Sequence, residues 1–280
     1  MPERLRTGGH SDDVGGRAPG TVIGMRIHQL NCGTMAGVSP TRVLLVESPD
    51  GLILVDTGIG LQDIAEPARR LGPLRHLLRP ALDPDETARR RINALGLDPA
   101  DVRHIVLTHL DLDPIGGLAD FPDATVHTVA GALTWSIRIP RWIERRRYRR
   151  AQWEHGPLLV EYEYDDERWE GFRAIPLDAV LEGMKLIELP GHTVGHAGVL
   201  VPGGDGPDVL HAGDAFYHRG QIDPAVRIPR WVPPMEKIMA LESPAIPLTH
   251  ARLAALAERR RGDLDVVCAH DASGPGGLRS

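Results

Sequence analysis

The sequence predicts a mixed α/β fold. Short apolar runs typical of strands occur in both halves of the 280-residue chain, helical stretches separate them, and no repeat period or low-complexity linker divides them. Hydrophobic residues make up 42% of the chain and charged residues 25%, which permits a substantial core and excludes global disorder. We expect one domain over residues 21–280, preceded by a flexible leader at residues 1–20 that is rich in Gly, Asp and Arg.

The first half of the chain is expected to open as a β-meander that leads into a helix and a buried strand. These elements are strands at 22–30, 42–47 and 52–56, a helix at 84–95 and a strand at 104–107. Ser-Pro-Asp-Gly at 48–51 forms the tight turn of the meander. Asp83 is a suitable N-cap for the helix, and Gly96 is a suitable stop.

The middle of the chain, about residues 130–172, is predicted to be a helical insertion. It holds four of the five tryptophans and a basic run at 145–150. Only Lys185 and Lys237 are lysines among the 32 basic residues, so against this arginine-rich background the run is interpreted as a solvated helix face, with recognition of an anionic substrate as the alternative. The elements expected after the insertion are strands at 185–189, 197–201, 209–212 and 265–269, and a helix at 247–260.

Charge and hydropathy exclude several classes of partner. The formal net charge of -6 has the wrong sign for a protein that coats phosphate backbones, so no nucleic-acid partner is expected. No apolar run approaches the roughly 20 residues of a membrane span, and the N-terminus lacks the apolar core of a signal peptide, so we expect no membrane partner and a cytoplasmic location. Cys32 and Cys268 allow at most one disulfide, and Cys268 is interpreted as a small buried strand residue.

Potential metal ligands follow four of the expected strands. They are His109, Asp111 and Asp113 in THLDLDPIGG, His192 in GHTVGH, Asp214 in AGD, and His270 in AHD. Taken alone, the H-x-D-x-D pattern is equally compatible with a polar turn, and a single histidine is more often structural. The coincidence of ligand types at four strand ends is hard to obtain from solvation alone and favours a common site.

These motifs, in this order and spacing, resemble the metallo-β-lactamase superfamily, and within it the lactonase-like and glyoxalase II-like hydrolases. THLDLDPIGG corresponds to the family's H-x-H-x-D-H motif, GHTVGH to its next histidine, GD to its bridging aspartate and AHD to its last histidine; GLILVDTG at 51–58 resembles its early D-T-G strand end. The resemblance covers about residues 22–271. It implies an αββα sandwich of two mixed sheets flanked by helices, with metals held at one edge of the sheets.

The resemblance also implies a centre with one or two divalent metal ions, zinc being the first expectation and manganese or iron the alternatives. The implied ligands are His109, Asp111, His192 and Asp214 for one ion, and Asp113, His270 and the shared Asp214 for the other. Asp111 stands where the family usually has a histidine, but a carboxylate still binds zinc and shifts the preference toward harder cations. Pro114 replaces another histidine and cannot ligate through its side chain, so the second half of the centre is expected to be the weaker one.

The activity that the resemblance implies is hydrolysis of a lactone, ester or thioester of a small molecule through a metal-bound hydroxide. Asp113 would orient the water. Tyr217, three residues after Asp214, would hydrogen-bond the substrate; a core tyrosine is the alternative. His196 and Asp56 are expected to support ligands rather than to bind metal.

Two other functions stay open at this point. One is a non-hydrolytic metalloenzyme on the same scaffold, such as a cyclase, a dehydratase or an iron-dependent oxidoreductase. The other is a degenerate scaffold that binds a ligand without turnover, which the ligand-competent residues argue against. The insertion and the loop at 216–234 are expected to shape the substrate pocket, and the oligomeric state is left open.

Overall fold

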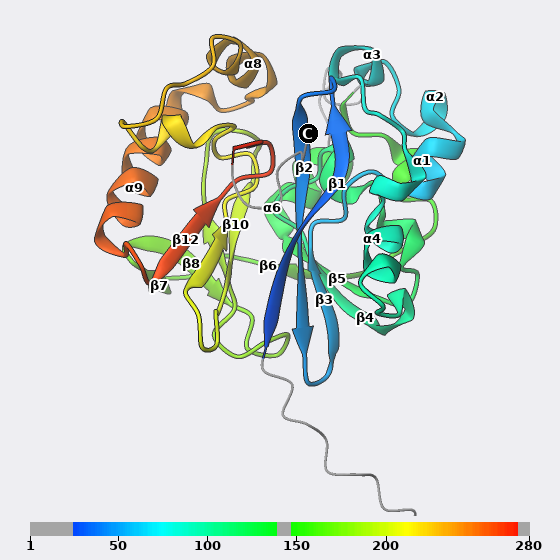
Figure 1. Cartoon of the computed structure of the whole chain (residues 1–280), viewed down its shortest axis with the longest axis horizontal. Coiled ribbons are helices and arrows are strands. Elements are labelled where there is room, and N and C mark those ends of the chain that lie inside the picture. Colours follow the sequence, from blue (N-terminus) through cyan, green and yellow to red (C-terminus); the bar gives the residue numbers. More distant parts are fainter. Residues whose placement is uncertain (1–24, 139–146, 274–280) are drawn as a thin grey trace, which may run out of the picture.

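The fold is a sandwich of two six-stranded sheets with helices on both outer faces (Figure 1). The computed structural model describes residues 25–138 and 147–273, so the expected leader at 1–20 lies outside the described residues. The strand order is β1-β2-β3-β4-β5-β6 in the first sheet and β12-β11-β10-β9-β8-β7 in the second. This arrangement confirms the predicted αββα class. Within the described ranges, no helix has the length and apolar character needed to cross a membrane.

The first sheet is mixed. Its strands are β1 (Arg26–Met35), β2 (Ser39–Ser48), β3 (Gly51–Val55), β4 (Val102–Val106), β5 (Thr125–Val129) and β6 (Leu158–Tyr162). The first three pair antiparallel, as expected of a meander, whereas β3, β4, β5 and β6 run parallel. The carboxyl ends of β3 and β4 therefore lie at the same edge of the sheet.

The helices that the structure describes in the first half of the chain are short. They are α1 (Leu61–Ala65), α2 (Pro67–Arg70), α3 (Leu74–Leu78), α4 (Ala88–Ala94), α5 (Leu112–Ile115) and α6 (Ala130–Leu133), with the single turns η1 (Pro84–Glu86), η2 (Pro99–Asp101), η3 (Leu118–Asp120), η4 (Thr134–Arg138) and η5 (Arg150–Gln152). The helix expected at 84–95 is divided at Thr87, whose extended backbone (ψ 147°) ends η1 and makes it the N-cap of α4. Asp83 caps η1 instead of a long helix.

The second sheet is also mixed. Its strands are β7 (Arg168–Trp169), β8 (Phe172–Pro176), β9 (Lys185–Glu188), β10 (Ala197–Val201), β11 (Asp208–His211) and β12 (Leu264–Val267). Only β11 and β12 pair parallel. Because β10 is antiparallel to both β9 and β11, the strands β9, β11 and β12 end at the same edge.

The remaining helices that the structure describes follow β11 in the sequence. They are η6 (Arg219–Gln221), α8 (Val232–Met239), η7 (Ser243–Ala245) and α9 (Ile246–Arg259). In Figure 1, α9 flanks the second sheet on its outer side, and α8 lies at the same end of the molecule as α3. The helix expected at 247–260 therefore corresponds to α9, shifted by one residue.

The expectation of a helical insertion at 130–172 is only partly correct. Its described part begins with α6 and η4 and includes η5, but it then supplies β6 to the edge of the first sheet and β7 to the edge of the second. The Leu-Leu-Val run at the start of β6 pairs in parallel register with β5. Tertiary pairing with a neighbouring strand thus decides the conformation of a segment whose tryptophans suggested helices.

A continuous apolar layer joins the inner faces of the two sheets. Its residues include Leu44, Val46, Ile53, Val55 and Val106 from the first sheet and Leu186, Ala197, Val199, Val201 and Val209 from the second. The outer layers hold Ile92 of α4 against the first sheet and Leu253 and Leu256 of α9 against the second. Each fully buried side chain of this size contributes about 1.5–3 kcal/mol. This packing fixes the two sets of strand ends against each other.

Candidate metal centre

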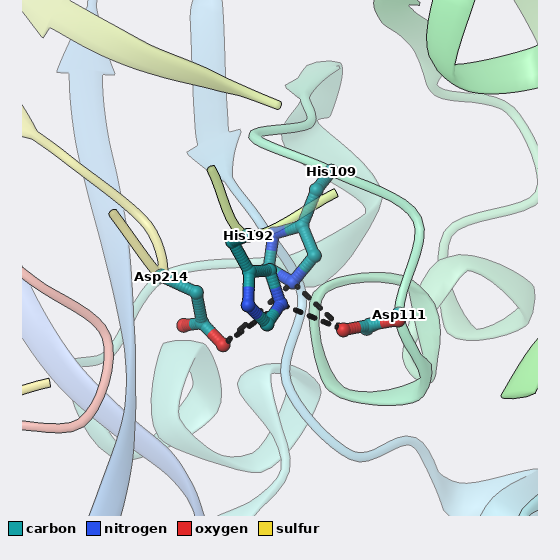
Figure 2. A group of neighbouring side chains, drawn as sticks. All are labelled: His109, Asp111, His192 and Asp214. Atoms are coloured by element: carbon teal, nitrogen blue, oxygen red, sulfur yellow. Dashed lines mark hydrogen bonds and ion pairs between the residues drawn. The ribbon is translucent and has the colours of Figure 1, made fainter. Parts of the chain in front are cut away.

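Four buried side chains meet where the carboxyl ends of the two sets of strands face each other (Figure 2). His109 and Asp111 follow β4, His192 follows β9, and Asp214 follows β11. One ligand atom from each lies within 4.8 Å of the other three. The Nε2 atom of His192 is 2.9 Å from Asp111 Oδ2 and 3.4 Å from Asp214 Oδ2. We call these four side chains the ligand cluster.

His109 is oriented through a chain of hydrogen bonds. The Asp56 carboxylate accepts from the Thr108 backbone N–H at 2.9 Å and from the Thr108 hydroxyl at 2.8 Å. With its own proton committed, the hydroxyl oxygen accepts from His109 Nδ1 at 2.8 Å. Burial raises the pKa of Asp56 to about 7, so Asp56 is mainly a carboxylate above neutral pH and accepts both hydrogen bonds there. Asp56 thus orients His109 through Thr108.

The other nitrogen of His109 faces the cluster. Nε2 is 3.4 Å from Asp111 Oδ2 and 3.9 Å from Asp214 Oδ2, and it is buried with no hydrogen-bond partner among the residues that the structure describes. Buried polar atoms are rarely without a partner. An imidazole nitrogen that faces two carboxylates has the arrangement of a metal ligand, so a bound metal ion would account for His109 Nε2.

Asp113 and His270 lie beside the ligand cluster. The Nδ1 atom of His270 donates to the Pro40 carbonyl oxygen at 2.8 Å. Its Nε2 atom faces Asp113 Oδ2 and Asp214 Oδ1, both at 3.3 Å. Neither residue belongs to the four-residue group within 4.8 Å. The structure therefore brings all six sequence-predicted ligands together, four in a tight cluster and two at its side.

The loop after β11 holds Asp214 in place. Its backbone N–H donates to His196 Nε2 at 3.1 Å, and His196 Nδ1 donates to the Leu189 carbonyl oxygen at 3.0 Å. Both nitrogens of His196 are thus used in support of the loop, as expected. Gly213 has a φ of +52°, and a Cβ there would lie 2.8 Å from Thr108 Oγ1, so only glycine fits at this position.

His211, which sequence reasoning did not single out, supports the same loop. Its Nε2 donates to the Arg42 carbonyl oxygen at 3.0 Å, and its Nδ1 accepts from the Gly213 N–H at 3.0 Å. Burial lowers the pKa of His211 to about 4, so the neutral ring is the form that makes both bonds.

The cluster attracts positive charge. Burial alone would raise the pKa of Asp214, but the neighbouring His270 and His192 imidazoles outweigh it and hold the pKa well below its usual range. Burial likewise opposes charge on His109, yet the nearby carboxylates of Asp111 and Asp214 raise its pKa to about 9. Buried carboxylates at this density favour any cation that can reach them, whether a proton or a metal ion.

Pro114 performs a structural role. Its carbonyl oxygen accepts from the Thr57 backbone N–H at 2.8 Å and from the Thr57 hydroxyl at 2.7 Å. These bonds tie the loop after β4, residues 107–117, which we call the ligand loop, to the end of β3. The ring itself offers no lone pair to a metal.

Arg147 corrects one expectation. Residues 145 and 146 lie outside the described residues, but Arg147 is not on a solvated face: its side chain is 11% exposed. It donates to both oxygens of Asp111, and its Nη2 atom lies 3.0 Å from His192 Nε2. The arginine-rich composition hid this residue. Asp111 could have indicated that an arginine reaches the centre, because a buried carboxylate that replaces an imidazole needs a positive partner.

An apolar pocket of about 270 Å³ opens onto the centre. Tyr217 is a buried lining residue of this pocket, with its hydroxyl 3.3 Å from His192 Nδ1. The apolar walls are Met35, Val38, Leu74, Leu77, Leu78, Leu112, Trp231, Met235 and Met239. The loop at 216–234 contributes through Tyr217 and Trp231, as expected. The insertion was also expected to shape the pocket, but its described part contributes no lining residue. Helix α3, which was not predicted, forms part of the wall instead.

The two cysteines take no part in the centre. Cys32 and Cys268 are free thiols and fully or almost fully buried. Burial raises the pKa of both thiols far above the ordinary value, which makes them unreactive.

The arrangement of strand ends and ligands agrees with a sequence comparison. The family model described as "Metallo-beta-lactamase superfamily" matches residues 36–270, a range that includes every loop of the centre. The chain belongs to the metallo-β-lactamase superfamily. Within this superfamily it is 46% identical to the probable metallo-hydrolase Rv2300c of Mycobacterium tuberculosis, over 96% of this chain and 92% of that protein. The chain is therefore a metallohydrolase.

More distant members of the superfamily are lactonases. The chain is 30% identical to the N-acyl homoserine lactonase AttM of Rhizobium johnstonii, over 64% of this chain and 65% of that protein. The crystal structure of a quorum-quenching N-acyl homoserine lactone lactonase has the same fold, with a TM-score of 0.63 at 18% identity over 88% of this chain and 91% of that chain.

Proposed function

We propose that this metallohydrolase cleaves a lactone, or a related ester or thioester, that carries an apolar substituent. The observation that carries the proposal is the apolar pocket that opens directly onto the ligand cluster. Pockets of this kind hold the apolar part of a ligand, while a few polar groups fix its reactive part. The similarity to AttM, a named lactonase, supports a lactone as the first substrate to test.

The proposed metal ligands are the six residues predicted from the sequence. They are His109, Asp111, His192 and Asp214 for one divalent ion, and Asp113, His270 and the shared Asp214 for a second. His109 and His270 each direct Nδ1 at an oxygen acceptor and Nε2 at carboxylates, which is the arrangement of metal-binding histidines. A divalent ion, with zinc as the first choice, would supply an acidified water and polarise the substrate carbonyl.

Tyr217 is proposed to bind the substrate oxygen. Its hydroxyl lies in the pocket beside the cluster, and burial raises its pKa well above the ordinary value, so it stays a neutral hydrogen-bond donor at working pH. Asp113 also lines the pocket and would orient the attacking water by accepting a hydrogen bond. The apolar walls would hold the substituent and keep bulk water away from the reacting groups.

The test begins with metal analysis of the purified protein and a panel of lactones, aryl esters and thioesters with short and long acyl chains. We expect bound metal, turnover that improves with chain length, and one ¹⁸O atom in the acid product when the reaction runs in H₂¹⁸O. Turnover without ¹⁸O incorporation would show a non-hydrolytic enzyme. A protein that binds no Zn²⁺, Mn²⁺ or Fe²⁺ would overturn the proposal.

The role of Tyr217 has its own prediction. Tyr217→Phe removes one donor to a developing oxyanion and is expected to lower kcat about 10²–10³-fold, with metal content unchanged. The matched control is Tyr162→Phe, because the Tyr162 hydroxyl bonds His127, a residue of β5 outside the ligand cluster. Normal turnover in Tyr217→Phe would mean that this tyrosine is only a core residue.

A further inference from the structure

The proposed function does not explain the position of Arg147. Its Nε and Nη2 atoms form a planar fork on the two oxygens of Asp111, each contact being 2.5 Å long. Nη1 donates to the Met239 carbonyl oxygen at 2.5 Å, and Nη2 lies 3.0 Å from His192 Nε2. A protein cation is thus held inside the ligand cluster.

Two of these contacts are made to atoms that a metal ion needs. A carboxylate oxygen has two lone pairs, so Asp111 can accept from a guanidinium and still bind a metal. In the tautomer of His192 that carries its proton on Nδ1, the single lone pair of Nε2 faces Arg147 Nη2. That lone pair cannot accept from Arg147 and coordinate a metal at the same time. The metal and Nη2 therefore compete for one atom.

The oxygen that Nη2 contacts is also the one that faces the other ligands. Asp111 Oδ2 lies 2.9 Å from His192 Nε2 and 3.4 Å from His109 Nε2. An arginine that only supports a carboxylate also contacts both of its oxygens in the usual fork, so the contact with His192 Nε2 is what sets Arg147 apart. Arg147 places its charge beside the position where a divalent ion would gather these ligands, and the two positive charges repel each other.

We propose that Arg147 is a resident cation of the ligand cluster that a divalent ion must displace from His192, so that Arg147 lowers the metal affinity of this half of the centre. The inference rests on the proposed metal centre. It makes the insertion, through Arg147, a determinant of how tightly and how reversibly metal is held.

The test measures the dissociation constants of the metal-stripped full-length protein for Zn²⁺ and Mn²⁺ by competition with a chelator. Hydrogen bonds to charged groups correspond to about 10–100-fold in an equilibrium, so Arg147→Met is expected to lower Kd by about that factor. The control is Arg149→Met, because the Arg149 guanidinium donates to the carbonyl oxygen of exposed Arg69, and its Kd should equal the wild-type value. An unchanged Kd in Arg147→Met overturns the proposal, and so does a weaker one, which would show that Arg147 supports Asp111 as a ligand.

A second variant covers the case in which Arg147→Met does not fold, as judged by circular dichroism. Arg147→Lys keeps the charge, but one ammonium group cannot contact both Asp111 oxygens and His192 at once, so its Kd should also fall; a value equal to the wild type overturns the proposal. If neither the wild type nor any variant binds metal, the proposed function fails as well. If the wild type binds metal and the Arg147 variants bind it equally, only this inference fails.

Discussion

Asp214 is the residue on which both halves of the proposed centre depend. Its two oxygens face different imidazoles, Oδ2 toward His192 at 3.4 Å and Oδ1 toward His270 at 3.3 Å. Of these two imidazoles, Asp113 contacts only that of His270, at 3.3 Å. The geometry therefore ranks the two carboxylates, and the ranking can be measured.

We predict that Asp214→Ala loses more bound metal and more activity than Asp113→Ala. The first substitution removes a shared ligand and the negative charge between two cations, and the second removes a ligand from one ion only. Elemental analysis of both variants after dialysis against the same chelator concentration measures the difference. An Asp214→Ala protein that keeps its metal and activity would show that the metal assignment is wrong.

His211 is predicted to make stability depend on pH. Its pKa is about 4 in the folded protein and about 6.5 in an unfolded chain, so between these values the unfolded state binds more protons. Stability is therefore complete above pH 6.5 and falls as the pH drops toward 4, with a loss of about 2 kcal/mol at pH 5. Urea unfolding of metal-free protein at pH 7.5 and pH 5 measures this loss.

The control variant is His211→Gln, whose amide can still donate to the Arg42 carbonyl and accept from the Gly213 N–H. The variant should show a pH dependence that is smaller by about 2 kcal/mol, because glutamine does not titrate. The same pH dependence in both proteins would rule out His211 as the source.

At the scale of elements, Arg70 of α2 joins four segments around the ligand loop. It is 1% exposed, and its Nε donates to Asp63 of α1 at 2.6 Å. Nη1 donates to the Ala151 carbonyl oxygen at 2.7 Å, and Nη2 to the Gly116 carbonyl oxygen at 3.3 Å. The insertion and the ligand loop are thus both held by one buried ion pair.

We predict that Arg70→Met lowers the free energy of unfolding by about 3–5 kcal/mol, because it leaves Asp63 as a buried charge without its partner. Its neighbour Arg69 is half exposed and pairs with Glu66 at the surface. Arg69→Met should therefore cost no more than about 1 kcal/mol. Denaturant unfolding of the two variants decides this, and equal losses would contradict a special role for the buried pair.

The sequence predicted most elements whose apolar pattern is regular. The strands at 197–201 and 185–189 agree with β10 and β9 to within one residue. Helix α8 was missed because it begins with Val-Pro-Pro-Met, and a pair of prolines usually indicates a break. Prolines in the first turn of a helix, however, remove no hydrogen bond of the helix. Strand β6 was missed because only its pairing with β5 makes it a strand.

The residues of the centre were predictable to different degrees. The six proposed ligands were predicted from chain order and from the resemblance of their motifs to the superfamily, and the structure brings them together because each follows a strand and the strands end at common edges. Arg147 and the α3 wall of the pocket were not, because nothing in the local sequence shows that they reach the centre. Tertiary contacts alone place them there.

At the scale of the whole molecule, the ligand cluster connects the two sheets. His109 and Asp111 belong to the first, and His192 and Asp214 to the second. We predict that metal stabilises the fold by mass action, by about 2.7 kcal/mol at a free metal concentration 100 times Kd. Thermal unfolding across a Zn²⁺ titration should show a rising Tm in the wild type and a smaller rise in His192→Gln. A Tm that does not respond to saturating metal would contradict binding to the folded state.

The order of these ligands along the chain bears on how the protein is made. Residues 109 and 214 are 105 positions apart, and a ribosome adds about 5–20 residues each second. For about 5–20 s the cluster is therefore incomplete, and the apolar inner face of the first sheet is not fully covered until the strands of the second sheet have followed. Metal binding by the complete cluster therefore cannot guide this early stage of folding. Metal acquisition is therefore a late step, and the growing chain depends on its own apolar packing, or on chaperones, until the second sheet emerges.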